Sequence, residues 1–262
     1  MRFGPIRARL VRPEVAERVI IPAYDTMTPQ ERKELLAAEP LSFLHALRSP
    51  DEYPPDVPFP RVLEDSRAGL ARLLAADAFG PVDSAAVFVY RLADGEHVQT
   101  GVVGGIDVAD AAEGRILPHE TTVVEREERL AAYLDHVGAA SSPVVVAARF
   151  PAELGRLVAE ATDATPAVSA RAADGVRQTV WAPPAELRER IVAALGEVER
   201  AYLVDGHHRI AAATRVAAAD PSRRRFLAAV FPLDELRNLA HHRALRSLGS
   251  SRPDELVAEL ER

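Results

Sequence analysis

The sequence contains no cysteine, and this absence excludes disulfides, thiolate metal sites and a cysteine nucleophile. Only histidine, aspartate and glutamate remain as strong metal ligands. No apolar run approaches the roughly 18 residues of a membrane span, and the N-terminal stretch MRFGPIRARLVRPE lacks the apolar segment of a secretory signal. We therefore expect a soluble protein without a membrane partner, located by default in the cytoplasm.

The chain also lacks an excess of positive charge. Its 39 acidic and 32 basic residues give a net charge of −7, the wrong sign for a protein whose main task is to coat a polyanion. Nucleic acid is therefore disfavoured as a partner. A homodimer is compatible with the sequence.

What the chain does have is enough apolar material for a sizeable core. It has 262 residues, of which 48% are hydrophobic and 27% charged, within the ordinary range of globular proteins. The length predicts either a single α/β domain over residues 1–262 or two lobes that share a sheet, one of about residues 1–110 and one of about residues 111–262.

Strand and helix patterns alternate irregularly along the chain. The expected strands are residues 6–11, 18–21, 85–92, 98–108, 143–150, 176–181, 201–204 and 226–231. The expected helices are residues 28–39 with a Thr28–Glu31 capping box, residues 63–76, a charged helix after Thr122, a helix that opens at Pro151, and residues 184–199 and 210–219.

Turn signals complete the outline. Asp94-Gly95 predicts a hairpin between two of these strands. Five prolines in residues 49–60 predict an exposed loop, and residues 233–262 read as two short helices around Gly249-Ser250-Ser251. The pattern predicts a mixed α+β (mixed α/β) fold, with a mixed sheet and flanking helices.

The strongest candidate for chemistry is the segment Asp205-Gly206-His207-His208-Arg209, which joins a buried strand to a helix. Unpaired backbone N–H groups and the helix dipole favour an anion at a helix N-terminus. Gly206 permits a positive φ, and the planar fork of Arg209 suits phosphate. The alternative is that Asp205 is an ordinary N-cap and the histidines are solvated.

A second candidate is His119-Glu120-Thr121-Thr122, which precedes the charged helix. A carboxylate beside an imidazole can act as a general base toward a hydroxyl or hold a divalent cation. The segment is not HExxH, because residue 123 is valine, so zincin chemistry is not supported. The alternative is that Thr122 caps a helix whose charged first turns are solvated.

Weaker candidates are Asp25, the segment Ser42 to His45, and the strand residues Tyr90-Arg91 and Gln99-Thr100. Taken singly, they read as a loop carboxylate, a packing histidine and a cross-strand polar pair. The triplet His241-His242-Arg243 has no preceding glycine or strand, which indicates a surface position.

Taken in order, these segments resemble the DUF1015 family over about residues 20–243. The matching pieces are IPAYD at 21–25, EPLSFLHALR at 39–48, FVYR at 88–91, QTG at 99–101, HETT at 119–122, REER at 126–129 and YLVDGHHRIAAA at 202–213. The chain departs from typical members at Ala23, Glu39 and His241-His242-Arg243.

The resemblance implies a relation to the ParB and sulfiredoxin-like superfamily, with its nucleotide-binding core and its kinases that phosphorylate free L-serine from ADP or ATP. Sulfiredoxin chemistry is excluded because it needs a cysteine at the turn. The implied function is transfer of phosphate from ATP or ADP, with Mg²⁺, to the hydroxyl of a small substrate, with free L-serine as the leading candidate.

The implied roles fall on three sets of residues. The expected catalytic residues are Glu120, His119 and His208. The expected nucleotide-binding residues are Asp205, Gly206, His207, His208 and Arg209, with Asp205 and Glu120 near the metal. The expected substrate-binding residues are Asp25, Arg91, Gln99 and Thr122. Two alternatives stay open: a ParB-like nucleotide-binding regulatory module without kinase activity, and a metal-dependent hydrolase that uses His119, Glu120, His207 and His208.

Overall fold

The computed structural model describes residues 1–22, 24–237, 247–249 and 252–260. Among these residues, a large mixed sheet runs in the order β6-β10-β7-β11-β5-β4-β9-β8, with β1 paired to β5. Two further strands, β2 and β3, form a small sheet of their own. The strands are β1 (Phe3–Gly4), β2 (Ile6–Ala8), β3 (Asp83–Ala86), β4 (Phe88–Asp94), β5 (His97–Asp107), β6 (Ile116–Leu117), β7 (Val144–Ala148), β8 (Val168–Arg171), β9 (Arg177–Trp181), β10 (Ala201–Asp205) and β11 (Arg225–Pro232).

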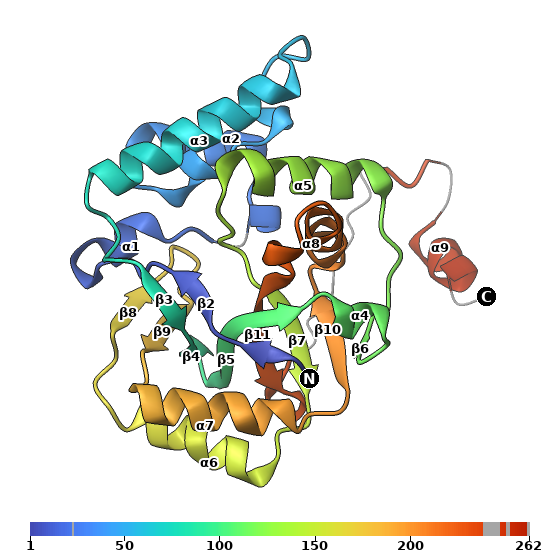
Figure 1. Cartoon of the computed structure of the whole chain (residues 1–262). Coiled ribbons are helices and arrows are strands. Elements are labelled where there is room, and N and C mark those ends of the chain that lie inside the picture. The colour runs from blue at the N-terminus through green and yellow to red at the C-terminus, as the bar shows by residue number, and fades with distance from the viewer. Residues whose placement is uncertain (23, 238–246, 250–251, 261–262) are drawn as a thin grey trace.

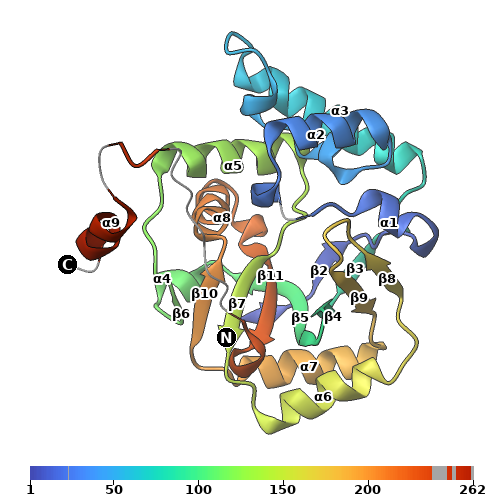
Figure 2. The same ribbon diagram turned by 180° about the vertical axis from the view of Figure 1, so that it is seen from behind.

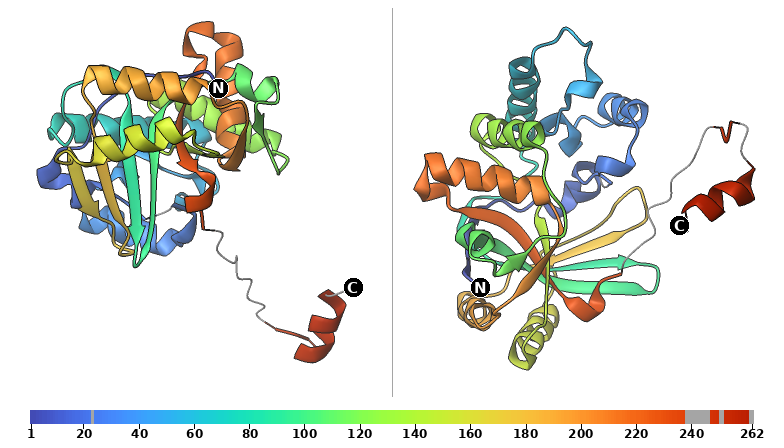
Figure 3. Two further views of the ribbon diagram at one scale, coloured as in Figure 1. Left: turned by 90° about the horizontal axis from the view of Figure 1, so that it is seen from below. Right: turned by 90° about the vertical axis from the view of Figure 1, so that its right-hand side faces the viewer.

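Helices lie on both sides of this sheet, so the predicted mixed α+β fold is confirmed. α6 and α7 cover one side, and α8 and α5 cover the other (Figure 1; Figure 2 from behind). α2 and α3 stack beyond α5, whereas α9 lies apart from these layers (Figure 3). The α-helices are α1 (Ala16–Val19), α2 (Pro29–Ala38), α3 (Phe59–Ala75), α4 (Ala109–Ala112), α5 (Val124–Val137), α6 (Ala152–Thr162), α7 (Ala185–Gly196), α8 (His207–Ala219) and α9 (Pro253–Leu260).

A row of valines holds the centre of the sheet together. Val146 of β7 is in register with Val230 of β11, which pairs with Val102 of β5, which in turn pairs with Val89 of β4. All four side chains are fully buried. Branched side chains in register pack well across strands, so this row holds β7 in place beside β10, the strand that carries the candidate site.

Several local predictions are confirmed. Thr28 and Glu31 form the complete capping box of α2. β4 and β5 form the predicted hairpin, in which Asp94 lies opposite His97 and Gly95 has a φ of 58°.

No helix in the described part of the chain combines the length and the apolar composition needed to cross a membrane.

The prediction of a strand at residues 18–21 is wrong, because Arg18 belongs to α1. The run Val19-Ile20-Ile21 suggested a strand, but Ala16 and Val19 are both buried, and their spacing of three places them on one helix face. Ala16 packs with Val168 and Ala170 of β8, so tertiary contacts overrode the β-branched run.

The predicted strand at residues 85–92 is divided at Val87. Its first part is in β3, which pairs with β2, and its second part is in β4 of the large sheet. The predicted strand at residues 6–11 keeps a ladder only at β2, followed by an isolated bridge from Val11 to Phe79. The short elements β6, β8 and α4 were not predicted, because few residues carry their pattern.

The predicted loop at residues 49–60 is only partly exposed. It contains a 3-10 turn, η4 (Pro50–Glu52), and α3 begins within it at Phe59. The side chain of Glu52 is buried and pairs with Arg32 and Arg48, because the turn folds against α2. In the tail, α9 matches the second predicted helix, while His241-His242-Arg243 lies outside the described residues.

Candidate functional site

The turn after β10 has the backbone geometry that its glycine suggests. α8 begins at His207, and its N-cap is Gly206, with a φ of 98°. L-amino acids avoid this left-handed region, whereas glycine enters it freely. A Cβ at Gly206 would also lie 2.9 Å from Nε of Arg209. The alternative in which Asp205 is the N-cap is therefore wrong.

Asp205 instead pairs with Arg209 across the turn. The Arg209 guanidinium also donates a hydrogen bond to the carbonyl oxygen of Pro143, 2.7 Å away, just before β7. The arginine thus ties the first turn of α8 to a neighbouring strand. Because guanidinium has five N–H donors, others stay free for a ligand.

The first backbone N–H groups of α8 are available to an anion. Gly206 offers no side chain to cap them, and no described hydrogen bond uses the backbone N–H of His207, His208 or Arg209. The first N–H groups of a helix carry the positive end of its dipole. The arrangement is that of a helix N-terminus able to bind phosphate.

The second candidate segment lies directly against this turn. β6 and β10 are parallel neighbours, with Leu117 in register with Tyr202. Parallel strands run in the same direction, so the residues that follow them lie side by side. The backbone N–H of His119 donates to Nε2 of His207 at 3.3 Å, and that of Val123 donates to Nε2 of His208 at 3.1 Å.

These contacts assign the tautomers of the histidines. Nε2 of His207 accepts a hydrogen bond, so in the neutral ring its proton lies on Nδ1, which is 3.7 Å from Oε2 of Glu120. Nδ1 of His119 lies 2.8 Å from the carbonyl oxygen of Leu203. A carbonyl only accepts, so this Nδ1 carries the proton, and Nε2 of neutral His119 is an acceptor.

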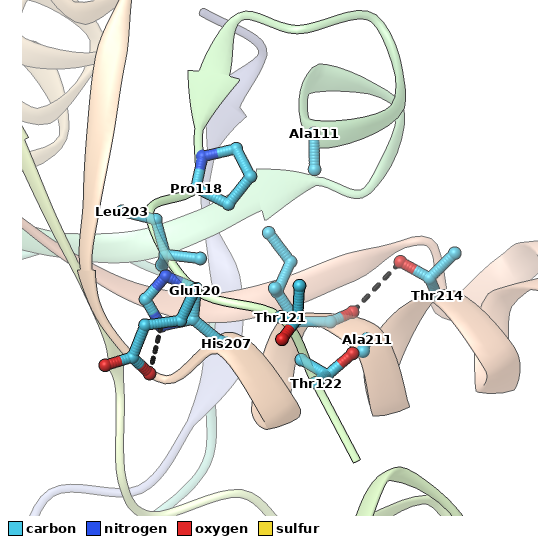
Figure 4. A pocket seen from close by; sticks show the side chains of 10 residues that line it. Ala111, Pro118, Glu120, Thr121, Thr122, Leu203, His207, Ala211 and Thr214 are labelled. Atoms are coloured by element: carbon cyan, nitrogen blue, oxygen red, sulfur yellow. Dashed lines mark hydrogen bonds and ion pairs between the residues drawn. The ribbon is translucent and has the colours of Figure 1, made fainter. Parts of the chain in front are cut away.

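With a neutral His119 ring, its Nε2 and the Glu120 carboxylate are two proton acceptors that lie near each other. Nε2 of His119 lies 4.0 Å from Oε1 of Glu120, too far for a direct hydrogen bond. The Glu120 side chain is 63% exposed, and Figure 4 shows its carboxylate beside the His207 ring. A hydroxyl placed between the two groups could donate its proton to either.

His207 itself is buried, with 5% of its surface exposed. Burial, reinforced by nearby His119, lowers the pKa of His207 below its ordinary value of 6.5. The neutral form is therefore favoured, as its role of acceptor for the His119 N–H requires.

Thr122 does not cap α5, whose N-cap is Val123. Its hydroxyl donates to Oε1 of Glu127, and Oε2 of Glu127 accepts from Nε of Arg215 at 2.9 Å. These two bonds lower the pKa of the Glu127 carboxyl. Nothing in the sequence pairs Glu127 with Arg215 or with Thr122, because no local pattern links residues on two different helices.

A cavity of about 440 Å³ lies next to this segment and α8 (Figure 4). The lining residues come from α4, segment 118–122, β10 and α8. They are Ala111, Pro118, Glu120, Thr121, Thr122, Leu203, His207, Ile210, Ala211 and Thr214.

Arg91 and Gln99 do not join this group. Arg91 lies on β4, and β7, β11 and β5 separate that strand from β10, a distance of roughly 19 Å across the sheet. Nε of Arg91 donates to Thr100 at 2.9 Å, and its guanidinium covers the Trp181 ring. Asp25 lies in the 3-10 turn η2 (Tyr24–Thr26), and its side chain is outside the described part of the structure.

The acidic and histidine side chains of the described residues form no group of three or more that could hold a metal ion. This argues against the metal-dependent hydrolase, which needs several protein ligands. It leaves room for Mg²⁺ that arrives with a nucleotide, because Mg²⁺ commonly takes one or two carboxylates together with phosphate oxygens.

Comparison with known proteins adds the family of the chain. A protein-family model matches residues 3–262. No curated protein matches, and no solved structure matches.

Proposed function

The chain belongs to the family described as "Protein of unknown function (DUF1015)", and we propose that it transfers a phosphoryl group from ATP or ADP to the hydroxyl of a small substrate. Free L-serine or a similar hydroxy amino acid is the leading acceptor. The observation that carries the proposal is the contact between segment 118–123 and the turn at residues 205–209, because it brings the candidate anion site close to the carboxylate of Glu120.

The turn would hold the phosphates of the nucleotide. The free backbone N–H groups of His207 and His208, together with the remaining donors of Arg209, provide a positively polarised cradle. Phosphoryl transfer depends mainly on positioning and charge neutralisation, so these groups suffice. Mg²⁺, when bound with the nucleotide, would neutralise phosphate charge, and Glu120 and Asp205 are the carboxylates nearest to hold it.

Glu120 and His119 would act on the acceptor. Oε1 of Glu120 and Nε2 of His119 are two acceptors 4.0 Å apart, and a substrate hydroxyl near both would release its proton to one of them as its oxygen attacks the terminal phosphorus. The bond from that phosphorus to its bridging oxygen would break, and ADP or AMP would leave with that oxygen. His208 would keep segment 118–123 in place by accepting the N–H of Val123. Thr122, two residues after Glu120, is the substrate-binding candidate that lies in segment 118–123.

The direct test incubates the protein with ATP or ADP, Mg²⁺ and a panel of hydroxy amino acids, and detects phosphorylated product by mass spectrometry. Glu120→Gln should reduce kcat by about 100-fold or more. Glu128→Gln is the matched control. The Glu128 side chain is 61% exposed and also lies near α8, 3.9 Å from Arg215, but it is not part of segment 118–123 or of the turn.

Arg209→Ala should weaken nucleotide binding by about tenfold or more, as loss of a charge-assisted contact predicts. Arg223→Ala is its control, since Arg223 also binds an aspartate and a backbone carbonyl, those of Asp135 and Leu134. Unchanged nucleotide affinity in Arg209→Ala would refute the assignment of residues 205–209 as the phosphate-binding turn, called the phosphate turn below. Nucleotide binding without transfer to any acceptor would refute the kinase and favour a ParB-like regulatory module.

A further inference from the structure

The cavity beside α8 is larger than a free hydroxy amino acid needs. Its volume of about 440 Å³ is typical of sites for drug-sized ligands, roughly 300–1,000 Å³. Four of its lining residues, His207, Ile210, Ala211 and Thr214, recur at the spacing of a single helix face. The cavity therefore extends for roughly 10 Å along α8, starting at the phosphate turn.

The side chains that line the cavity offer no positive charge to the carboxylate of an amino acid. Ala111, Pro118 and Leu203 are apolar, and Glu120 is the only acidic or basic side chain besides the neutral His207. No lysine or arginine lines the cavity. The carboxylate of an amino acid would lie there unpaired and near Glu120, which is costly. An uncharged ligand meets no such penalty.

The threonine hydroxyl groups of the cavity suit the polar edge of a flat ligand. Thr214 donates its hydroxyl proton to the carbonyl oxygen of Ile210 at 2.9 Å, so its oxygen remains an acceptor for an N–H group of a ligand. Thr121 also lines the cavity, and its hydroxyl can both donate and accept. A nucleobase carries both kinds of group along its edge and is otherwise apolar on its faces.

We propose that this cavity binds the nucleoside part of the phosphate donor, with the base toward Thr214 and the phosphates emerging at His207 onto the turn. The inference rests on the proposed phosphotransferase function. It places the amino acid acceptor outside the cavity, on the solvent-exposed side of Glu120.

The test measures binding of ATP, adenosine and inorganic tripolyphosphate to the full chain by calorimetry. Ala211→Leu fills the cavity and should weaken ATP and adenosine binding by about tenfold or more, while tripolyphosphate binding stays within about twofold. Ala218→Leu is the matched control, because it lies two turns further along the same helix face and is exposed.

Thr214→Val provides a second variant of nearly unchanged volume, and should weaken ATP binding by about threefold or more while sparing tripolyphosphate. If both variants bind ATP like the wild type, or if Ala211→Leu raises only the KM of the acceptor, the cavity assignment is overturned while the phosphate turn stands. If the wild type binds neither ATP nor tripolyphosphate, the proposed function fails as well.

Discussion

At the scale of single residues, Gly206 decides how α8 starts. Its φ of 98° directs the chain from β10 into the helix without a side-chain cap, which leaves the first N–H groups free. The missing Cβ also leaves space for the Arg209 side chain. Any other residue here would disturb both the backbone and the arginine.

Gly206→Ala should therefore lower the free energy of unfolding by about 1–3 kcal/mol, because of left-handed strain and the contact with Arg209. Gly114→Ala tests the strain alone, since Gly114 has a φ of 70° and open space around it. Urea unfolding of both variants measures the difference. Equal losses would show that the Arg209 contact contributes nothing.

His207 should give the folding stability a pH dependence. Burial lowers its pKa in the folded protein, so the unfolded chain binds the proton more readily. The stability that neutral His207 contributes is fully present above the unfolded-state pKa of about 6.5. It is lost as the pH falls through the lowered folded-state pKa.

In His207→Gln, the amide oxygen can still accept the His119 N–H but does not titrate. We expect the free energy of unfolding of this variant to fall less steeply than that of the wild type as the pH is lowered from 7 to 5. Urea unfolding at several pH values measures the slopes. The groups near His207 that could alter the profile are His119, Glu120, Asp205 and His208. Parallel pH profiles of the unfolding free energy in the variant and the wild type would show that His207 does not cause the pH dependence.

At the scale of elements, the site depends on how α5 and α8 hold segment 118–123. Glu127 of α5 binds both the Thr122 hydroxyl and Arg215 of α8. Its side chain is 12% exposed, so these bonds are partly shielded from solvent. The segment is thus anchored at one end by β6 and at the other by Glu127.

Glu127→Ala should lower the free energy of unfolding by about 1–2 kcal/mol and speed hydrogen exchange of the Val123 amide. Glu128→Ala is the control: it removes the same charge at the next residue, whose side chain is 61% exposed. The control should change stability by less than about 0.5 kcal/mol. If the two variants behave alike, Glu127 does not anchor the segment.

At the scale of the whole molecule, the large sheet draws strands from both sides of residue 110. β5 pairs with β11, and β4 pairs with β9, so neither the first nor the second part of the chain holds the sheet alone. α3 also contacts α5, and Tyr133 of α5 donates a hydrogen bond to the carbonyl oxygen of Ala46 at 2.7 Å.

We therefore expect one cooperative unfolding transition. Trp181 is the only tryptophan in the sequence, and it is buried in β9, far across the sheet from α8. Its fluorescence and the far-UV circular dichroism should change with the same urea midpoint. Two separate midpoints would instead indicate two lobes that unfold independently.

Features whose geometry depends on neighbouring residues could be predicted from the sequence. The capping box at Thr28, the Asp94-Gly95 hairpin and the strand–glycine–helix turn at Gly206 all follow from local patterns, because their geometry is set within a few residues. The prediction that the turn binds an anion depends on the same local pattern.

The residues that lie opposite that turn could not be predicted in this way, because they depend on the tertiary structure. The strand that brings His119 and Glu120 to it is β6, whose two residues carry no recognisable pattern, and its partner β10 lies far along the chain. In the same way, Arg91 and Gln99 lie on strands that the sequence predicts, but the order of the strands in the sheet places them away from the site. Strand order and helix packing depend on contacts between distant residues, which local propensity does not encode.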